Sequence, residues 1–188
     1  MAGVSALTIS GCLSSSGLVG VDKDYPTISA QLDREKYKEI SIDVKATRQF
    51  SDSTPAKIKI SFTNISDSEI PFTFGATPPF SQYISQDNSS PRLIIIPKTN
   101  NSHIVVKKPH KLPPEKPVNG CWRLPGNVIV YPRAKKTEID AGETISEGYV
   151  VLNYQSTQQC LLADDYHFVS KNYFGRNKSL ELTIQIRN

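Results

Sequence analysis

The residues whose chemistry is easiest to interpret in this sequence are its three cysteines. Cys12 follows Ile9, Ser10 and Gly11 at the end of a short apolar stretch. An aliphatic residue and two small residues before a cysteine are typical of a lipobox, the signal after which an exported chain is cleaved and its new N-terminal cysteine receives lipid. The sequence therefore predicts a protein held by lipid on Cys12 at the extracytoplasmic face of the cell membrane.

Residues 1–11 would then be a signal peptide, although an unusual one. Its apolar part covers only residues 2–9, and no Lys or Arg precedes it, whereas export signals begin with a positively charged region. Two interpretations stay open: a charged segment is encoded upstream of Met1, or the match to a lipobox is accidental.

Cys121 and Cys160 are left as a pair once Cys12 carries lipid. Disulfides persist outside the cytoplasm, and lipid explains why the number of cysteines is odd. We predict a Cys121–Cys160 disulfide, and we expect Trp122 to shield it within the core, as tryptophan does in immunoglobulin domains. The alternative is two unpaired buried thiols in a cytosolic protein.

The elements that must position these groups begin after a predicted tether, residues 12–39. Residues 13–25 are rich in Ser and Gly, as flexible linkers are. Residues 32–39 are charged and show no apolar face, so we interpret them as linker or as a short helical turn. A single folded domain is predicted for residues 40–188, a length that can enclose its own core.

Within this domain, apolar and polar residues alternate with the period of half-buried strands. The expected strands are residues 40–46, 57–62, 70–74, 93–96, 104–106, 128–131, 144–152, 166–170 and 180–186. We expect residues 104–106 to pair with residues 93–96. Seven to nine short strands without a helical pattern predict an all-β fold, an immunoglobulin-like antiparallel β-sandwich.

Several stretches of the domain resemble a known family. Its later strands and turns are similar to those of the BsuPI-like intracellular proteinase inhibitor domain, and the residues that carry this are Trp122, Arg123, Asp140, Ala141, Gly142, Glu143, Asp165, Tyr166, His167 and Phe168. Residues 56–64 and 70–74 are similar to its opening strands. The chain from about residue 40 also resembles uncharacterised haloarchaeal lipoproteins. The resemblance implies a β-sandwich and, as an alternative function, proteinase inhibition, but no reactive-site loop can be matched position by position.

The sequence offers few residues for catalysis or metal binding. It has no Gly-x-Ser-x-Gly elbow and no Cys-x-x-Cys pair, His103 and His110 lie in loop-like sequence, and His167 is predicted on the outward side of a strand. Asp164 and Asp165 could help to bind calcium, but adjacent acids before a strand are more often solvated. We therefore predict no catalytic residue, no metal and no cofactor, and keep a hydrolase with an unrecognised site as a third hypothesis.

Two segments are candidates for contact with a partner. Pro78, Pro79, Phe80 and Tyr83 place aromatic rings on a loop, as interface cores do, although this loop could equally fold back onto the edge of the sandwich. The Lys- and Pro-rich residues 107–116 could meet an anionic surface, lipid headgroups or a polyproline-binding partner, or could be a solvated crossover between sheets.

The charge balance indicates which class of partner to expect. The 22 Lys and Arg residues exceed the 18 acidic ones by only +4, and this excess is spread along the chain, so we expect no nucleic acid. Four Asn-x-Ser sequons, which could carry glycans outside the cytoplasm, begin at Asn64, Asn88, Asn100 and Asn177. The predicted function is a lipid-anchored surface module that binds a protein or a surface glycan without catalysis.

Overall fold

The computed structural model describes residues 25–33, 38–86, 92–99, 104–106, 112–131, 135–154, 160, 162–173 and 178–188. Within these residues the chain forms eleven strands. They are β1 (Thr27–Asp33), β2 (Ile40–Arg48), β3 (Lys57–Asn64), β4 (Ile70–Phe74), β5 (Leu93–Pro97), β6 (Ile104–Val106), β7 (Val128–Val130), β8 (Lys135–Ile139), β9 (Thr144–Asn153), β10 (Asp164–Tyr173) and β11 (Lys178–Arg187). None of the described residues belongs to a helix that could span a membrane.

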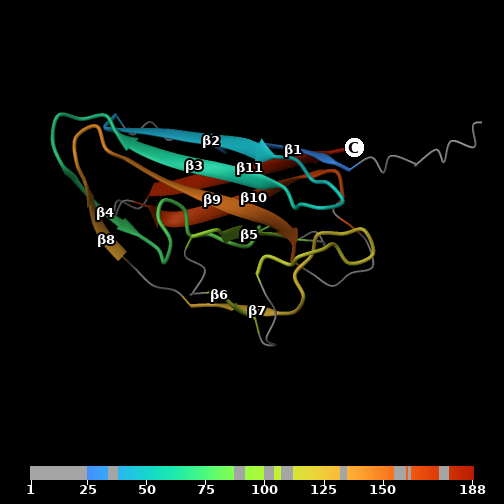
Figure 1. Cartoon of the computed structure of the whole chain (residues 1–188). Coiled ribbons are helices and arrows are strands. Elements are labelled where there is room, and N and C mark those ends of the chain that lie inside the picture. The colour runs from blue at the N-terminus through green and yellow to red at the C-terminus, as the bar shows by residue number, and fades with distance from the viewer. Residues whose placement is uncertain are drawn as a thin grey trace, which may run out of the picture.

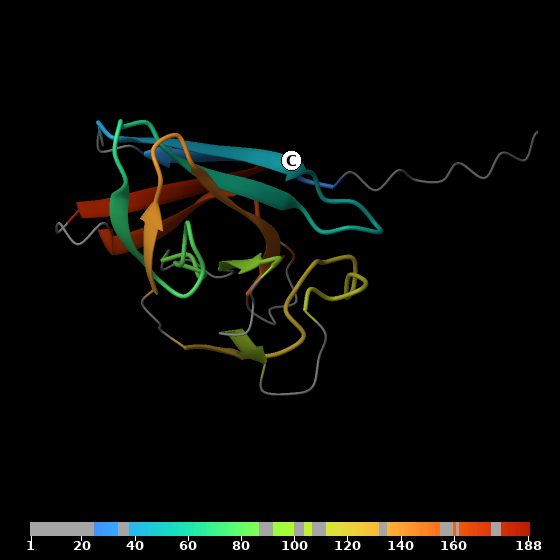
Figure 2. The same ribbon diagram turned by 60° about the vertical axis from the view of Figure 1, so that its left-hand side comes forward.

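The strands form an antiparallel β-sandwich, which confirms the predicted fold class. One sheet has the strand order β1-β11-β10 and the other β2-β3-β9-β5, while β4 pairs with β8 and β6 with β7. The turned view of Figure 2 shows β10 and β11 (red) below β2 and β3 (cyan to teal), with β1 (blue) beside β2, and Figure 1 labels these strands. The eleven strands exceed the seven to nine that we expected.

Alternation of residue type explains why these strands enclose a core. On β11, Leu182 and Ile184 are fully buried, and on β3 the same holds for Ile58 and Ile60, whereas the intervening Lys59 is exposed. Every residue of β5 is buried, in keeping with its unbroken apolar sequence. The inward side chains of both sheets form one continuous apolar cluster, so the sandwich has a single core.

Strand β1 corrects the predicted tether of residues 12–39. It pairs along its whole length with β11, and Ile28 is buried while Ala30 and Leu32 pack against the core. These three residues alternate with polar ones in the sequence, so the strand signal was present between the Ser/Gly-rich and charged stretches. The folded domain therefore includes residues before 40.

Two further pairings differ from expectation. Strand β8 was not expected; it pairs with β4, which lies beside β8 alone among the described strands. Strand β6 pairs with β7, and not with β5, whose partner is β9. Short apolar runs have no strong signal for their partner, because the pairing depends on loop paths that residue periodicity does not report.

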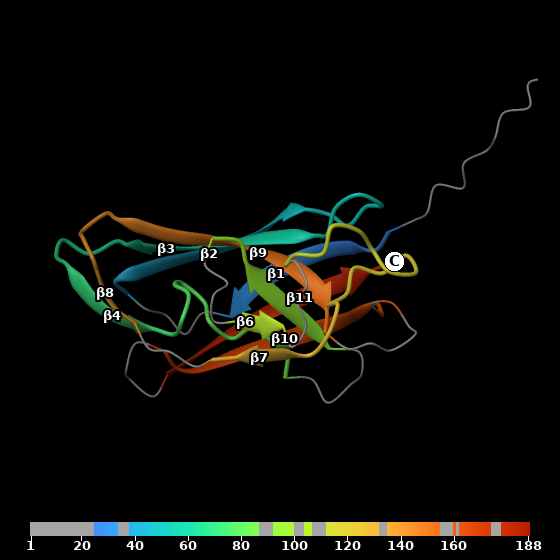
Figure 3. The same ribbon diagram turned by 60° about the horizontal axis from the view of Figure 1, so that its bottom comes forward.

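The two ends of the sandwich carry different segments. The start of β1, the C-terminus, the β2–β3 connection and the yellow segment 112–127 gather at one end in Figures 1 and 3. Thr27 pairs with Arg187 at this end. We call it the tether end, because β1 begins there. Strand β3 runs from it to Asn64 at the opposite end, where the β3–β4 and β8–β9 turns meet.

Candidate interaction surface

Cys121 and Cys160 form a disulfide in the structure. Their Cα atoms are 5.3 Å apart, although 39 positions separate them in the sequence. Cys121 is buried, but Cys160 is exposed, so the bridge lies at the surface. This corrects the expectation that Trp122 would shield it within the core.

Trp122 instead fastens segment 112–127 to the sandwich. Its ring is 2% exposed and packs in the core, and its indole N–H donates to the carbonyl oxygen of Ser51 at 2.7 Å. The backbone on both sides of Arg123 pairs with the last residue of β9. Asn153 N–H donates to Trp122 O at 2.8 Å, and Leu124 N–H donates to Asn153 O at 3.0 Å. The segment is therefore held by the β2–β3 connection, by β9 and by the disulfide.

The start of the described chain is also fixed at the tether end. Tyr25 donates its hydroxyl hydrogen to Asp52, and the Gln49 side chain bonds both the N–H and the carbonyl oxygen of Ile28. The hydrogen bond to Asp52, followed by desolvation and the charge of Asp52, raises the pKa of Tyr25 from 10.0 to about 12. Tyr25 therefore lies beside the β2–β3 connection.

Two exposed apolar side chains flank the disulfide at this end. Val118 is 49% exposed and exchanges two backbone hydrogen bonds with Cys121. Leu162, which is 45% exposed, lies two positions after Cys160, and its carbonyl oxygen accepts a 3.0 Å hydrogen bond from the buried Tyr166. Both positions are held by partners inside the fold.

The proposed contact loop is not available as a surface. Phe80 and Tyr83 are 0% and 3% exposed, Pro79 is buried and Pro78 is half-buried. The hydroxyl of Tyr149 donates to Phe80 O at 2.7 Å and accepts from Phe80 N–H at 3.1 Å, which draws the loop into the core. The alternative weighed above, that this loop folds back onto the sandwich, is the arrangement observed.

The prediction that Asn64 could carry a glycan is corrected as well. Asn64 is fully buried, and its amide group donates to Ser68 O at 2.7 Å and to Ile139 O at 2.8 Å, while its oxygen accepts from the N–H and the hydroxyl of Ser66. A glycan cannot be attached to this nitrogen in the folded protein. Asn88, Asn100 and Asn177 lie outside the described residues.

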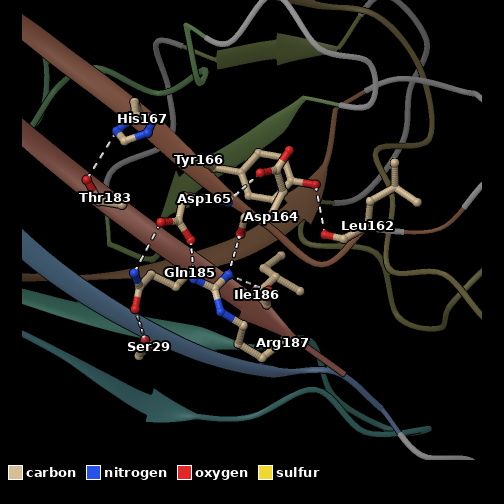
Figure 4. A network of polar contacts seen from close by, with 10 residues as sticks. All are labelled: Ser29, Leu162, Asp164, Asp165, Tyr166, His167, Thr183, Gln185, Ile186 and Arg187. Atoms are coloured by element: carbon tan, nitrogen blue, oxygen red, sulfur yellow. Dashed lines mark hydrogen bonds and ion pairs between the residues drawn. The ribbon is translucent and has the colours of Figure 1, made fainter.

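The outward side of the β1-β11-β10 sheet carries a row of polar contacts, drawn in Figure 4. Asp165 pairs with Arg187 and accepts a 3.2 Å hydrogen bond from Gln185, whose oxygen lies 3.2 Å from the Ser29 hydroxyl. The hydrogen bond from Arg187 is the main cause that lowers the pKa of Asp165. Both carboxylate oxygens of Asp165 therefore have partners within the protein, and this arrangement does not support the calcium hypothesis.

His167 on this face does not form a catalytic triad with Thr183 and Glu181. Its Nδ1 atom lies 3.2 Å from the Thr183 hydroxyl and 3.0 Å from a Glu181 oxygen. A nucleophile and an orienting acid need the two different ring nitrogens, whereas the Thr183 hydroxyl and the Glu181 carboxylate both lie at Nδ1. Within the part of the chain that the structure describes, no group of His, Cys, Asp and Glu side chains is placed to hold a metal ion.

Other predicted residues lie outside the described part of the chain: Cys12, His103, His110 and residues 107–111. Comparisons with protein-family models, with curated proteins and with solved structures found no match.

Proposed function

We propose that this chain is a lipid-anchored module on the extracytoplasmic face of the cell membrane, which binds a partner without catalysis. The observation that supports it most is the Cys121–Cys160 disulfide. Disulfides form and persist in oxidising compartments. Once these two cysteines are joined, Cys12 is the one cysteine left in the sequence, and lipid on its sulfur accounts for it.

The position of Tyr25 is consistent with such an anchor. Twelve residues separate Cys12 from Tyr25. They reach at most about 42 Å when fully extended, and a flexible chain of this length averages about 19 Å between its ends. A sandwich tethered in this way stands close to the bilayer with its tether end towards it.

The polar face in Figure 4 supports binding as the activity. Thr183 is 8% exposed, so its hydroxyl is poorly placed to attack a substrate, and the histidine beside it has one ring nitrogen engaged twice. By contrast, Ser29, Gln185 and Arg187 form, together with Asp165, a row of hydrogen-bonded polar side chains across neighbouring strands. Such a row suits recognition of a polar partner, either a protein or a surface glycan.

Mass measurement of the protein extracted from native membranes tests the anchor. We expect the mature chain to lack residues 1–11, to carry lipid on Cys12, and to release thiols for alkylation only after reduction. As a control, a Cys12→Ser variant expressed in the same host should leave the membrane fraction. A native chain that retains Met1 and an alkylatable Cys12 would overturn the proposal.

A second measurement tests binding against the alternative function. Chemical crosslinking in native membranes should capture a partner, and the crosslinks should include β10 or β11. Incubation with a panel of serine proteases should leave their rates unchanged. Stoichiometric loss of protease activity would instead favour the proteinase inhibitor that the family resemblance implies.

A further inference from the structure

We propose that the tether end of the sandwich contacts the bilayer surface directly, through Val118 and Leu162 on either side of the disulfide. This inference rests on the proposed function, because lipid on Cys12 is what brings that end to the membrane. The occupant of the apolar patch is then the headgroup region of the same bilayer that holds the anchor.

Both side chains of the proposed contact are exposed. Val118 and Leu162 each leave nearly half of the side chain open to water, at 49% and 45%. Moving apolar surface out of water is favourable by about 25 cal/mol per Å². Exposed apolar residues are ordinary when they are single, but these two flank one disulfide, on segments that are distant in the sequence.

The route of the chain identifies what covers them. Tyr25 bonds to Asp52 in the β2–β3 connection, and Trp122, four positions after Val118, bonds to the neighbouring Ser51. Tyr25 and the apolar patch therefore lie at the same end of the sandwich. With a short linker to an anchored Cys12, the bilayer is the surface held at high local concentration opposite the patch.

The patch is also rigid before it meets a surface. Val118 is hydrogen-bonded to Cys121, whose sulfur is bonded to Cys160, and Leu162 is fixed through Tyr166. Ordering of loops on binding costs free energy, and little of that cost remains here. A weak contact can therefore be populated once the anchor makes it intramolecular.

Charge at the patch predicts which lipids matter. Glu115 and Lys116 precede Val118 with opposite charges, and Arg187 nearby is paired with Asp165. No excess of positive charge is present among these residues, so the contact should not require anionic lipid. Zwitterionic vesicles are the appropriate probe.

The test uses the full chain and does not depend on lipidation in a cell. When the disulfide is formed, Cys12 is the single free thiol, so it can be coupled to a maleimide lipid in phosphatidylcholine vesicles. Hydrogen exchange is then compared with that of the same chain capped by a small maleimide. We expect slower exchange for residues 118–124 and 162–166 on vesicles, and no change for residues 64–69 at the opposite end.

Substitutions make the test specific. In uncoupled Cys12→Ser chain, Leu162→Asp should lower the partition onto these vesicles about fivefold, because only about half of the leucine side chain is available for transfer. Val118→Asp should act similarly. The matched control is Ile65→Asp, which changes an apolar residue that is 57% exposed in the β3–β4 turn. Unchanged unfolding midpoints would show that all three variants fold.

The outcomes separate this inference from the proposed function. Equal partition of Leu162→Asp and Ile65→Asp, or no protection of residues 118–124 on coupling, would overturn the membrane contact whatever the native mass shows. A dimer in solution that Leu162→Asp dissociates, without vesicle protection, would also overturn it in favour of a second copy. The native mass of Cys12 tests the anchor independently.

Discussion

Removal of the Cys121–Cys160 disulfide should lower stability by an amount that depends on the length of the loop that the disulfide closes. Joining residues 39 positions apart restricts the unfolded chain and stabilises the fold by about 4 kcal/mol on loop-closure entropy. For a domain of this size that corresponds to about 8–16 °C in Tm. The variant is Cys121→Ala with Cys160→Ala, in a Cys12→Ser background that removes the remaining thiol.

The fold itself should survive this substitution. Trp122 stays bonded to Ser51, and the backbone hydrogen bonds of Leu124 and Trp122 with Asn153 do not involve sulfur. Cys160 is exposed, so alanine there leaves no buried cavity, and at the buried Cys121 alanine removes only the sulfur atom. We therefore expect the variant to lose stability but to keep its strand content.

Urea unfolding followed by tryptophan fluorescence measures this loss, because Trp122 is the single tryptophan and is 2% exposed in the folded state. Adding a thiol reductant to the Cys12→Ser chain should lower its stability to that of the double alanine variant. The reductant should leave the variant unchanged. A stability loss under about 1 kcal/mol would refute the entropic argument, as would a reductant effect that persists in the variant.

Three further substitutions test single interactions. Asn64→Ala should cost about 2–4 kcal/mol in urea unfolding, because buried carbonyls lose their donor, and mass spectrometry of protein from a glycosylating host should find Asn64 unmodified. Tyr149→Phe should cost about 2–3 kcal/mol, because the N–H and carbonyl of Phe80 lose their buried partner; a smaller loss than in an exposed Tyr→Phe control would contradict this. Asp52→Asn should return the pKa of Tyr25 from about 12 towards 10.0 in an NMR titration. The stabilisation from that hydrogen bond should be complete below pH 10.0 and be lost as the pH rises towards 12.

The sequence predicted the strands that have the clearest alternation and missed those where context masked it. Ile28 and Leu32 of β1 alternate as well as the residues of β3 do, but charged and Ser-rich neighbours suggested a linker. Strand β8, with two lysines and one glutamate in five residues, has little apolar signal. Its position depends on pairing with β4, which periodicity cannot report.

The candidate contact residues show a second limit of sequence reasoning. An aromatic residue in a Pro-rich loop can face a partner or the core, and the sequence of the loop does not decide between them. Here the hydroxyl of Tyr149, 69 positions away, bonds the backbone of Phe80 and selects burial. Asn64 is similar: its sequon is local, but the carbonyl of Ile139 that occupies its amide is 75 positions away.

The disulfide was predictable because elimination among three cysteines does not need geometry, whereas its place in the fold was not. That place matters for the membrane contact that we propose. Since β1 and β11 are antiparallel, the start of β1 and the C-terminus both lie at the tether end, beside the β2–β3 connection, and the anchor that we propose on Cys12 would turn this end to the bilayer. The polar row of Figure 4 lies on the side of the sandwich, along β10 and β11. A partner bound along that side need not displace the tether end from the membrane, so partner binding and membrane contact should respond to different substitutions.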